Sequence, residues 1–194
     1  KTFSDGSRSD YLIAKCIGKR RHGTPASAVP GSNRSEGKFP HRLDRIRSLD
    51  ADSTHSYDML ELSLDYRVED APVPATGTAT LTAVGLEDQS VIPFNAEQLD
   101  VMSVMENDSA LSFTEQNDTV YVQRFLAAGD TVTLDFAVSV PVIANNSDVG
   151  YHVAWQHAFT FAEPYGARRW YPCFDQPFDK FNRVTLAVNM PDYW

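Results

Sequence analysis

The sequence has 194 residues, of which 42% are hydrophobic and 22% charged, a composition typical of a globular protein with a core of its own. Its apolar runs are short and broken by Pro, Asp or Ser, so we expect no segment that spans a membrane. Residues 1–47 carry a net charge of +7 and residues 48–194 a net charge of −16. An acidic body of this kind repels phosphate, which argues against a nucleic-acid-binding protein.

The basic residues 1–47 are expected to form an irregular leader rather than a domain. Ser9 or Asp10 can cap one short helix over residues 11–17, which Gly18 would end. A leader this basic is expected to dock on the acidic body, and an RNA-binding or membrane-binding arm is the alternative. The sequence has no secretion signal of the usual pattern, and it is compatible both with secretion after removal of a signal and with the cytoplasm.

Residues 48–194 are expected to form one all-β domain. From residue 57 the hydrophobic pattern has a period of two, which is typical of strands with one buried face. The first strand carries Leu60, Leu62, Leu64, Tyr66 and Val68 on its apolar face. Its hairpin partner is expected over residues 76–84, and further strands over residues 91–94, 99–104, 111–113, 119–125, 132–140 and 184–190. These eight or nine short strands predict an antiparallel β-sandwich or saddle.

Residues 151–181 break this alternation and concentrate the aromatic side chains. Ten of the 22 aromatic residues of the chain lie in this stretch, together with several prolines and paired charges. A loop of this composition either locks a core or faces a partner. Aromatic rings beside acidic groups are also found in carbohydrate-binding sandwiches, so a sugar-binding module stays open at this point.

The sequence argues against a complete metal site or a nucleophile within this chain. None of the five histidines lies in an H-E-x-x-H motif. His152 and His157 would point to opposite faces of a single strand, which is the wrong geometry for one tetrahedral ion. The two cysteines lie far apart, which excludes a disulfide scaffold. Cys173, between Pro172 and Phe174, is expected to be a buried small side chain with a raised pKa rather than a reactive thiol.

The stretch over residues 160–180 carries the one specific motif, TFAEPYGARRWYPCFDQPFDK. It resembles the motif T-Q-x-E-P-x-x-A-R-R-x-x-P-C-x-D-x-P, which closes the N-terminal domain of the gluzincin zinc aminopeptidases, the family of membrane alanyl aminopeptidase and leukotriene hydrolase. As in that family, a strand and a proline follow, here residues 184–190 and Pro191. The resemblance is strong over residues 160–180 and diffuse over the remainder of residues 48–194.

The resemblance implies that residues 48–194 are the N-terminal β-saddle domain of a zinc aminopeptidase that acts on peptides. The zinc and the catalytic residues would belong to a catalytic domain that follows residue 194, so no catalytic residue and no metal ligand is assigned to this chain. A non-catalytic β-sandwich module that binds peptide or carbohydrate is the alternative. A degenerate aminopeptidase relative that serves as a scaffold is a second one.

Within the motif, the resemblance assigns Glu163 to the free α-ammonium group of the substrate. Flanking aromatic rings are expected to exclude water there and to strengthen the contact. Phe161 stands where the family commonly has Gln, and this departure puts the recognition of the first substrate residue in doubt. Arg168 and Arg169 are expected to hold the loop through ion pairs with Asp175 and Asp179. The ordinary alternative for Glu163 is a solvated loop residue.

Overall fold

The computed structural model describes residues 56–144, 149–154, 157–176 and 179–193. Residues 1–55 lie outside this range, and with them the predicted leader and its short helix. The strands are β1 (Tyr57–Arg67), β2 (Ala75–Gly85), β3 (Ile92–Asn95), β4 (Asp100–Glu106), β5 (Ser109–Leu111), β6 (Phe113–Gln116), β7 (Thr119–Val122), β8 (Thr131–Val140), β9 (Gly150–Ala154), β10 (His157–Phe161) and β11 (Arg183–Asn189). The 3₁₀ helix η2 (Ala167–Arg169) lies between β10 and β11 in the described part of the chain. Within the described residues no helix is long and apolar enough to cross a membrane.

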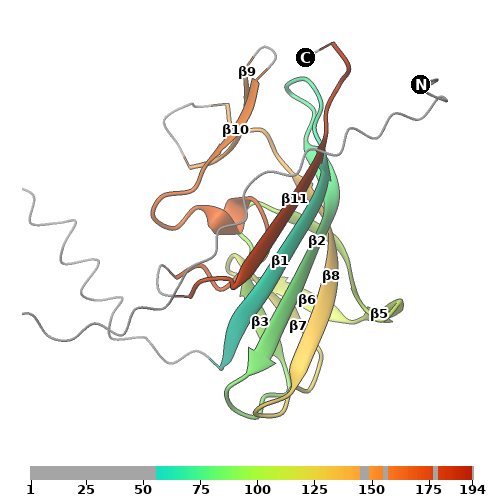
Figure 1. Ribbon diagram of the computed structural model, residues 1–194, viewed down its shortest axis with the longest axis vertical. Coiled ribbons are helices and arrows are strands. Elements are labelled where there is room, and N and C mark those ends of the chain that lie inside the picture. The colour runs from blue at the N-terminus through green and yellow to red at the C-terminus, as the bar shows by residue number, and fades with distance from the viewer. Residues whose placement is uncertain (1–55, 145–148, 155–156, 177–178, 194) are drawn as a thin grey trace, which may run out of the picture. The chain divides into compact units, whose positions relative to one another are not determined.

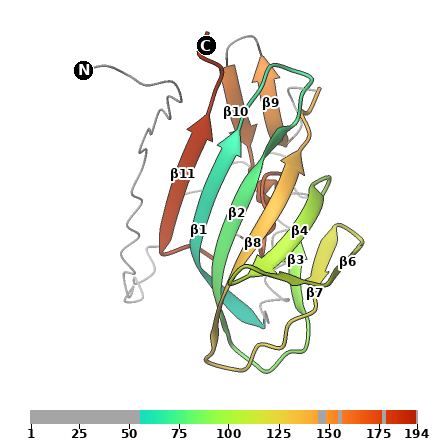
Figure 2. The ribbon, with the colours of Figure 1, turned by 90° about the vertical axis from the view of Figure 1, so that its right-hand side faces the viewer.

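The strands form three sheets, and the prediction of an all-β sandwich is confirmed (Figure 1). The large sheet has the order β11-β1-β2-β8-β4-β5, and Figure 2 shows its long central strands side by side. The small sheets are β3-β7-β6 and the β9–β10 hairpin. All pairs are antiparallel except β1 with β11, which run in parallel. The predicted antiparallel fold therefore carries one parallel strand at an edge of the large sheet.

The central strands of the large sheet follow the predicted alternation. In β8 every second side chain, from Val132 to Val140, is buried, and the intervening ones are less buried. In β2 small alanine side chains and Leu81 face the core while threonines face outward. Because each strand buries one face against a second layer, both have the alternation of a half-buried strand, and the strands predicted over residues 76–84 and 132–140 are confirmed.

The first strand confirms the predicted apolar face at Leu62, Leu64, Tyr66 and Val68 and corrects it at Leu60. The pairing of β1 with β2 shifts between Met59 and Glu61, so the strand contains a β-bulge there. Before the bulge Tyr57 and Met59 are buried, and after it Leu62 and Leu64 are buried. Leu60, which was expected on the buried face, is only half-buried. One extra residue in a strand reverses the side chains that follow, and the hydrophobic pattern alone did not reveal it.

The second layer packs on the large sheet through aromatic side chains. Phe94 of β3 contacts Phe136 of β8, with ring centroids 5.1 Å apart, and Tyr57 of β1, with centroids 5.3 Å apart. All three side chains are almost completely buried. The Phe94–Phe136 contact is edge-to-face and the Tyr57–Phe94 contact is tilted, and such ring pairs add to the free energy gained by burying the rings. This aromatic cluster joins the two layers of the sandwich.

Two Asn-Asp pairs close tight hairpins in the structure. Asn107 and Asp108 connect β4 with β5, and Asn117 and Asp118 connect β6 with β7. All four residues have a positive φ, between 49° and 61°. Asn and Asp tolerate this left-handed conformation better than other non-glycine residues, and the turn type matches the twist of the paired strands. The single strand predicted over residues 111–113 is divided in the structure, because β5 ends at Leu111 and β6 begins at Phe113.

The eleven strands of the described part exceed the eight or nine that were expected. The difference lies chiefly in the β9–β10 hairpin, because residues 151–181 were expected to break the alternation of the strands. β11 forms where it was predicted, but Val184 and Leu186 are exposed. An edge strand with apolar side chains on an open face is the least expected feature of the fold.

Candidate functional site

The predicted substrate-binding residues lie at the end of β10 and in the turn that follows it. Phe161 is the last residue of β10, and Glu163 begins the turn that leads into η2. Gly166 closes this turn, since its N–H donates to the carbonyl of Ala162 at 2.9 Å. A side chain at Gly166 would come within 2.8 Å of Val149 and 3.0 Å of the Ala162 backbone. The close approach of these segments therefore requires glycine at this position.

The loop after the turn is held by a buried ion pair between Arg168 and Asp175. The Nε of Arg168 donates to the Asp175 carboxylate at 2.8 Å. The Asp175 side chain is only 7% exposed and that of Arg168 is 21% exposed. The N–H of Asp175 donates to the side-chain oxygen of Asn95 at 3.1 Å. The two ends of the loop are thus tied to each other and to β3.

Main-chain hydrogen bonds attach the same loop to the second layer. The N–H of Asn95 donates to the Cys173 carbonyl at 2.7 Å, and the N–H of Cys173 donates back at 3.0 Å. The N–H of Glu97 donates to the Arg168 carbonyl at 3.0 Å. These bonds make residues 168–175 an extension of the folded core rather than a free loop.

Arg169 makes a separate set of contacts. It forms an ion pair with Glu97 and donates to the carbonyl of Val149 at 3.0 Å. Both charged side chains are largely buried. Because Val149 directly precedes β9, this arginine connects the β9–β10 hairpin to the loop and to the segment that follows β3.

Trp170 packs between two tyrosines at the base of the turn. Its ring lies 4.7 Å from that of Tyr66 and nearly perpendicular to it, and 5.1 Å from that of Tyr151 in a stacked arrangement. The hydroxyl of Tyr66 donates to the Trp170 carbonyl at 2.8 Å. Figure 1 shows η2 and the β9–β10 hairpin together on one side of β11. The aromatic residues of this segment therefore build a rigid base beneath the turn.

Glu163 and Phe161 are both exposed in the structure. Phe159 and Phe161 are themselves about half exposed, so within this chain they do not enclose Glu163, and its shielding from water in the whole enzyme stays a prediction. All five residues of β10 are exposed, since β10 pairs only with β9 and its outer edge is open. The role of Glu163 in binding a substrate ammonium group stays a prediction, as does that of Phe161.

Among the described residues Asp179 forms no ion pair with an arginine, contrary to expectation. It lies beside Asp58 of β1, and burial together with this second carboxylate raises the pKa of Asp179 to about 7. The two carboxyl groups cannot both be ionised at low cost when they are this close. The sequence offered no signal for the contact, because the two residues are far apart in the chain.

The cysteine and the two histidines that the sequence raised as candidates are Cys173, His152 and His157. Cys173 is buried and its thiol pKa is raised well above the usual value by burial, which confirms the expected inert cysteine. His152 and His157 lie on β9 and β10 instead of one strand. His152 is completely buried and stacks on Phe159 with ring centroids 4.9 Å apart. No group of three or more His, Cys, Asp or Glu side chains suited to a metal ion occurs among the described residues.

The partners that sequence reasoning missed are Glu97, Asn95, Tyr66 and Tyr151. Each contacts a residue of the motif from another part of the sequence: Glu97 pairs with Arg169, Asn95 accepts from Asp175, and Tyr66 and Tyr151 pack on Trp170. A motif identifies residues that are near one another in the chain, and it is silent about the strands against which they pack. Only the fold supplies these partners.

The sequence matches no protein-family profile, and no curated protein is similar to it in sequence. Similarity appears in solved structures. An M1 zinc metallopeptidase from Deinococcus radiodurans matches with a TM-score of 0.64 at 22% identity, over 72% of this chain and 33% of that one. A variant of that enzyme bound to a Tyr-Ser-Ala substrate matches with a TM-score of 0.63 at 23% identity, over 71% of this chain and 33% of that one.

Aminopeptidase A from Legionella pneumophila, solved with aspartic acid, matches with a TM-score of 0.60 at 18% identity, over 72% of this chain and 16% of that one. This chain spans a third or less of the length of these three structures. At these identities the likeness establishes the fold: the β-domain described above is a fold found in M1 zinc metallopeptidases.

Proposed function

We propose that residues 48–194 form the N-terminal domain of a zinc aminopeptidase and that this domain helps to bind the free amino terminus of peptide substrates. The observation that carries the proposal is the fold shared with M1 zinc metallopeptidases, supported by the motif over residues 160–180. The described residues offer no cluster for zinc, so in this proposal the metal belongs to a catalytic domain elsewhere in the parent protein. In this proposal the role of this chain is to recognise the substrate.

The proposed recognition depends on Glu163. A carboxylate accepts charge-assisted hydrogen bonds from an α-ammonium group, and such bonds are about twice as strong as neutral ones. The turn that carries Glu163 is held at both ends, by β10 on one side and by the Arg168–Asp175 pair on the other. A fixed turn loses little conformational entropy when substrate binds. In the isolated chain Glu163 is exposed, and in the proposed enzyme the catalytic domain supplies the opposite wall of the cleft.

The proposal is tested with Glu163→Gln in the gene product that contains this chain. For peptides with a free amino group we expect kcat/KM to fall about ten- to hundred-fold, which corresponds to roughly 1.5–3 kcal/mol for a hydrogen bond to a charged group. The matched control is Glu115→Gln, which changes another exposed glutamate, on β6. Unchanged kinetics in the Glu163 variant, or an equal loss in both, would contradict the assignment.

A second function is favoured by the exposed rings of Phe159 and Phe161. Exposed aromatic side chains on an open strand edge are typical of modules that hold a peptide or a sugar without cleaving it. The two proposals differ in their dependence on zinc. If the gene product binds peptide equally well after chelation and never hydrolyses it, the binding module or the degenerate relative is correct.

A further inference from the structure

One edge of β10 is open. The strand pairs with β9 over its whole length, and no other strand in the described part of the chain pairs with its second edge. All five residues of β10 are exposed. Natural proteins usually protect such an edge with Lys, Pro or a charge that points inward, and the sequence HAFTF of β10 contains none of these. The edge is therefore able to pair with a further strand.

The hydrogen bonds of β9 determine which main-chain groups of β10 face the open edge. Tyr151 of β9 forms a parallel bridge with Val142, and its carbonyl accepts from the N–H of Ile143 at 2.7 Å. The main-chain groups of Tyr151 thus point away from β10, so Tyr151 and its partner Thr160 form a non-hydrogen-bonded pair. The N–H and C=O of Thr160 consequently point to the open edge, and those of Ala158, two residues earlier, point the same way.

Ala158 and Thr160 together present two donors and two acceptors along this edge. Among the described residues none forms a hydrogen bond with these four groups. The two residues lie about 6.8 Å apart along the strand, because an antiparallel strand rises about 3.4 Å per residue. A strand of another polypeptide carries its own donors and acceptors at the same spacing. The edge is therefore complementary to the main chain of an extended peptide.

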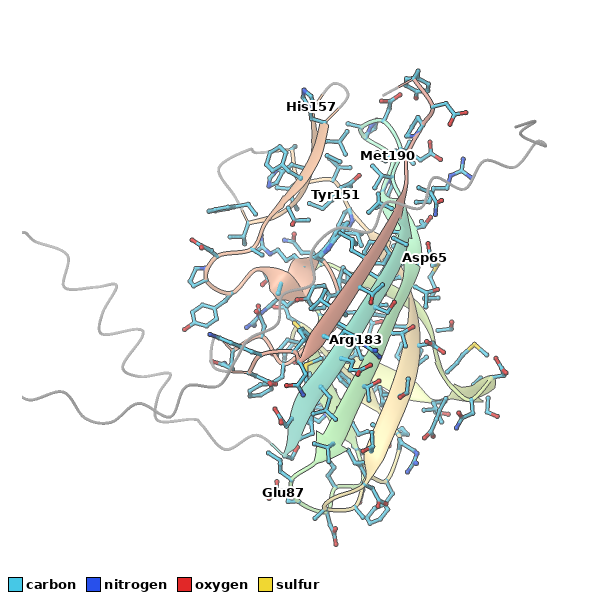
Figure 3. The ribbon with its side chains drawn as sticks, in the orientation of Figure 1. Asp65, Glu87, Tyr151, His157, Arg183 and Met190 are labelled. Atoms are coloured by element: carbon cyan, nitrogen blue, oxygen red, sulfur yellow. The ribbon has the colours of Figure 1, made fainter. Side chains whose placement is uncertain are left out.

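An apolar cavity of about 330 Å³ lies beside the same edge. Ala158 and Thr160 line it from β10, and Figure 3 shows the β9–β10 hairpin beside the end of β11. The opposite wall is formed by Leu186, Val188 and Met190. In an antiparallel pair, residues directly opposite each other have their side chains on the same face of the sheet. A peptide residue opposite Thr160 would therefore place its side chain in the cavity.

The other face of β10 is aromatic. Phe159 and Phe161 alternate with the residues that line the edge of the cavity, and both are about half exposed. The ring of Phe159 stacks on the buried ring of His152, with centroids 4.9 Å apart, which holds it in position. Aromatic rings stabilise a neighbouring strand through cross-strand contacts with apolar side chains. Both faces of an added strand would thus meet apolar surface.

The position of Glu163 determines the direction of the peptide. β10 runs toward Glu163, which follows its last residue by two positions. A strand antiparallel to β10 therefore has its amino-terminal end beside the exposed Glu163 carboxylate, which can accept hydrogen bonds from a free ammonium group. The carbonyl of Ala162 already accepts from the N–H of Gly166, so the open edge ends where the amino terminus would lie. The β10 edge of a second copy would bring no amino terminus to this position.

We propose that the substrate peptide binds to β10 as an added antiparallel strand, with main-chain hydrogen bonds to Ala158 and Thr160 and every second side chain in the cavity beside β11. This mode of binding is the addition of a strand to an open sheet edge. The direction of the peptide rests on the proposed function, in which Glu163 holds the amino terminus. The main-chain bonds suit peptides of many sequences, and the cavity selects apolar side chains.

A scan of N-methylated peptides tests the added strand. The probe is a hexapeptide of alternating leucine and threonine with a free amino terminus and a fluorescent label at its carboxyl end, and fluorescence anisotropy follows its binding to the 194-residue chain. Methylation should weaken binding roughly two- to tenfold at every second residue, because each of these N–H groups donates one hydrogen bond to β10. The intervening residues are the matched control, since their N–H groups point away from β10 and their methylation should leave the affinity nearly unchanged.

A change in the cavity provides a second measurement. Leu186→Asp places a carboxylate in the apolar cavity and should weaken binding of the same peptide about tenfold, because a charge that loses water on binding is costly. The matched control is Val184→Asp, a change at an equally exposed position of β11 that does not line the cavity. Circular dichroism of each variant checks that the β-domain is folded.

The outcomes separate the added strand from the proposed function. An alternating pattern in the N-methyl scan, with weaker binding by Leu186→Asp than by Val184→Asp, supports the added strand. A flat scan, equal binding by the two variants, or no binding by the folded chain overturns it. A dimer that forms through β10 and excludes the peptide shows that a second copy covers the edge, and also overturns it.

Acetylation of the amino group of the peptide tests Glu163 separately. If acetylation leaves the affinity unchanged while the scan alternates, the binding of the amino terminus by Glu163 is wrong and the added strand is supported. If acetylation weakens binding while the scan is flat, the added strand is overturned and the role of Glu163 is supported.

Discussion

Replacing Asp175 by alanine tests whether the buried ion pair holds the motif loop in place. The change leaves the guanidinium of Arg168, which is 21% exposed, without its carboxylate. Breaking a buried pair by removal of one partner costs roughly 3–5 kcal/mol, because the remaining charge is left uncompensated. Since Arg168 keeps partial access to water, we expect a loss of about 2–3 kcal/mol in the free energy of unfolding.

The loss is measured by urea unfolding at neutral pH. With a slope of about 2 kcal/mol per molar urea for a domain of this size, the expected loss lowers the midpoint by about 1–1.5 M. Asp175→Asn should have a smaller effect, because the amide oxygen still accepts a hydrogen bond from Arg168. The difference in unfolding free energy between the two variants gives the contribution of the negative charge of Asp175.

An exposed ion pair provides the control. Arg183 and Glu61 join β11 to β1, and their side chains are 65% and 41% exposed. Exposed pairs contribute up to about 1 kcal/mol, so Glu61→Ala should lower the midpoint by no more than about 0.5 M. Equal shifts for Asp175→Ala and Glu61→Ala would refute the argument that burial decides the strength of the pair.

Three further predictions concern the rest of the chain. Asp179 in the folded chain holds a proton that the unfolded chain releases, because its pKa is raised to about 7 from a usual value of 3.8. Its contribution to stability is therefore present below about pH 4 and lost as the pH rises to about 7. Asp179→Asn should consequently raise the free energy of unfolding at pH 8 and leave it nearly unchanged at pH 4. An equal change at both pH values would contradict the raised pKa. Phe136→Ala should cost about 3–5 kcal/mol, because Phe136 is completely buried against Phe94, and a midpoint shift below that of Asp175→Ala would argue against this packing. The isolated chain should not hydrolyse aminoacyl arylamides with or without added zinc, whereas hydrolysis that a chelator abolishes would overturn the assignment of the metal to another domain.

The sequence predicted the central strands well because burial on one face leaves a period of two. β8 and β2 follow that pattern along nearly their whole length. It failed where a strand departs from simple alternation. The bulge in β1 adds one residue and reverses the buried face, and the parallel pairing of β11 joins segments more than a hundred residues apart. Neither feature has a local cause that a sequence pattern can record.

For the candidate site, the motif identified the loop but not what holds it. Arg168 and Arg169 were predicted to form ion pairs with Asp175 and Asp179. Arg168 does pair with Asp175, seven residues away in the same loop, whereas Arg169 pairs with Glu97 of a distant segment. The aromatic residues were expected either to lock a core or to face a partner. In the structure Trp170 is partly buried and packs against the core, whereas Phe161 is exposed, so the segment divides between the two roles.

This division leads to a last prediction about Glu163. The turn that carries it is exposed, whereas the residues on either side are fixed by Arg168, Trp170 and β10. Glu163→Gln should therefore leave the free energy of unfolding of the chain, measured in urea, unchanged to within about 0.5 kcal/mol, the usual range for exposed positions, while it lowers peptidase activity in the parent protein. Asp175→Ala should lower both, because it releases one end of the turn. If Asp175→Ala destabilised the chain but left the activity of the folded parent protein intact, the position of Glu163 would not depend on the buried pair.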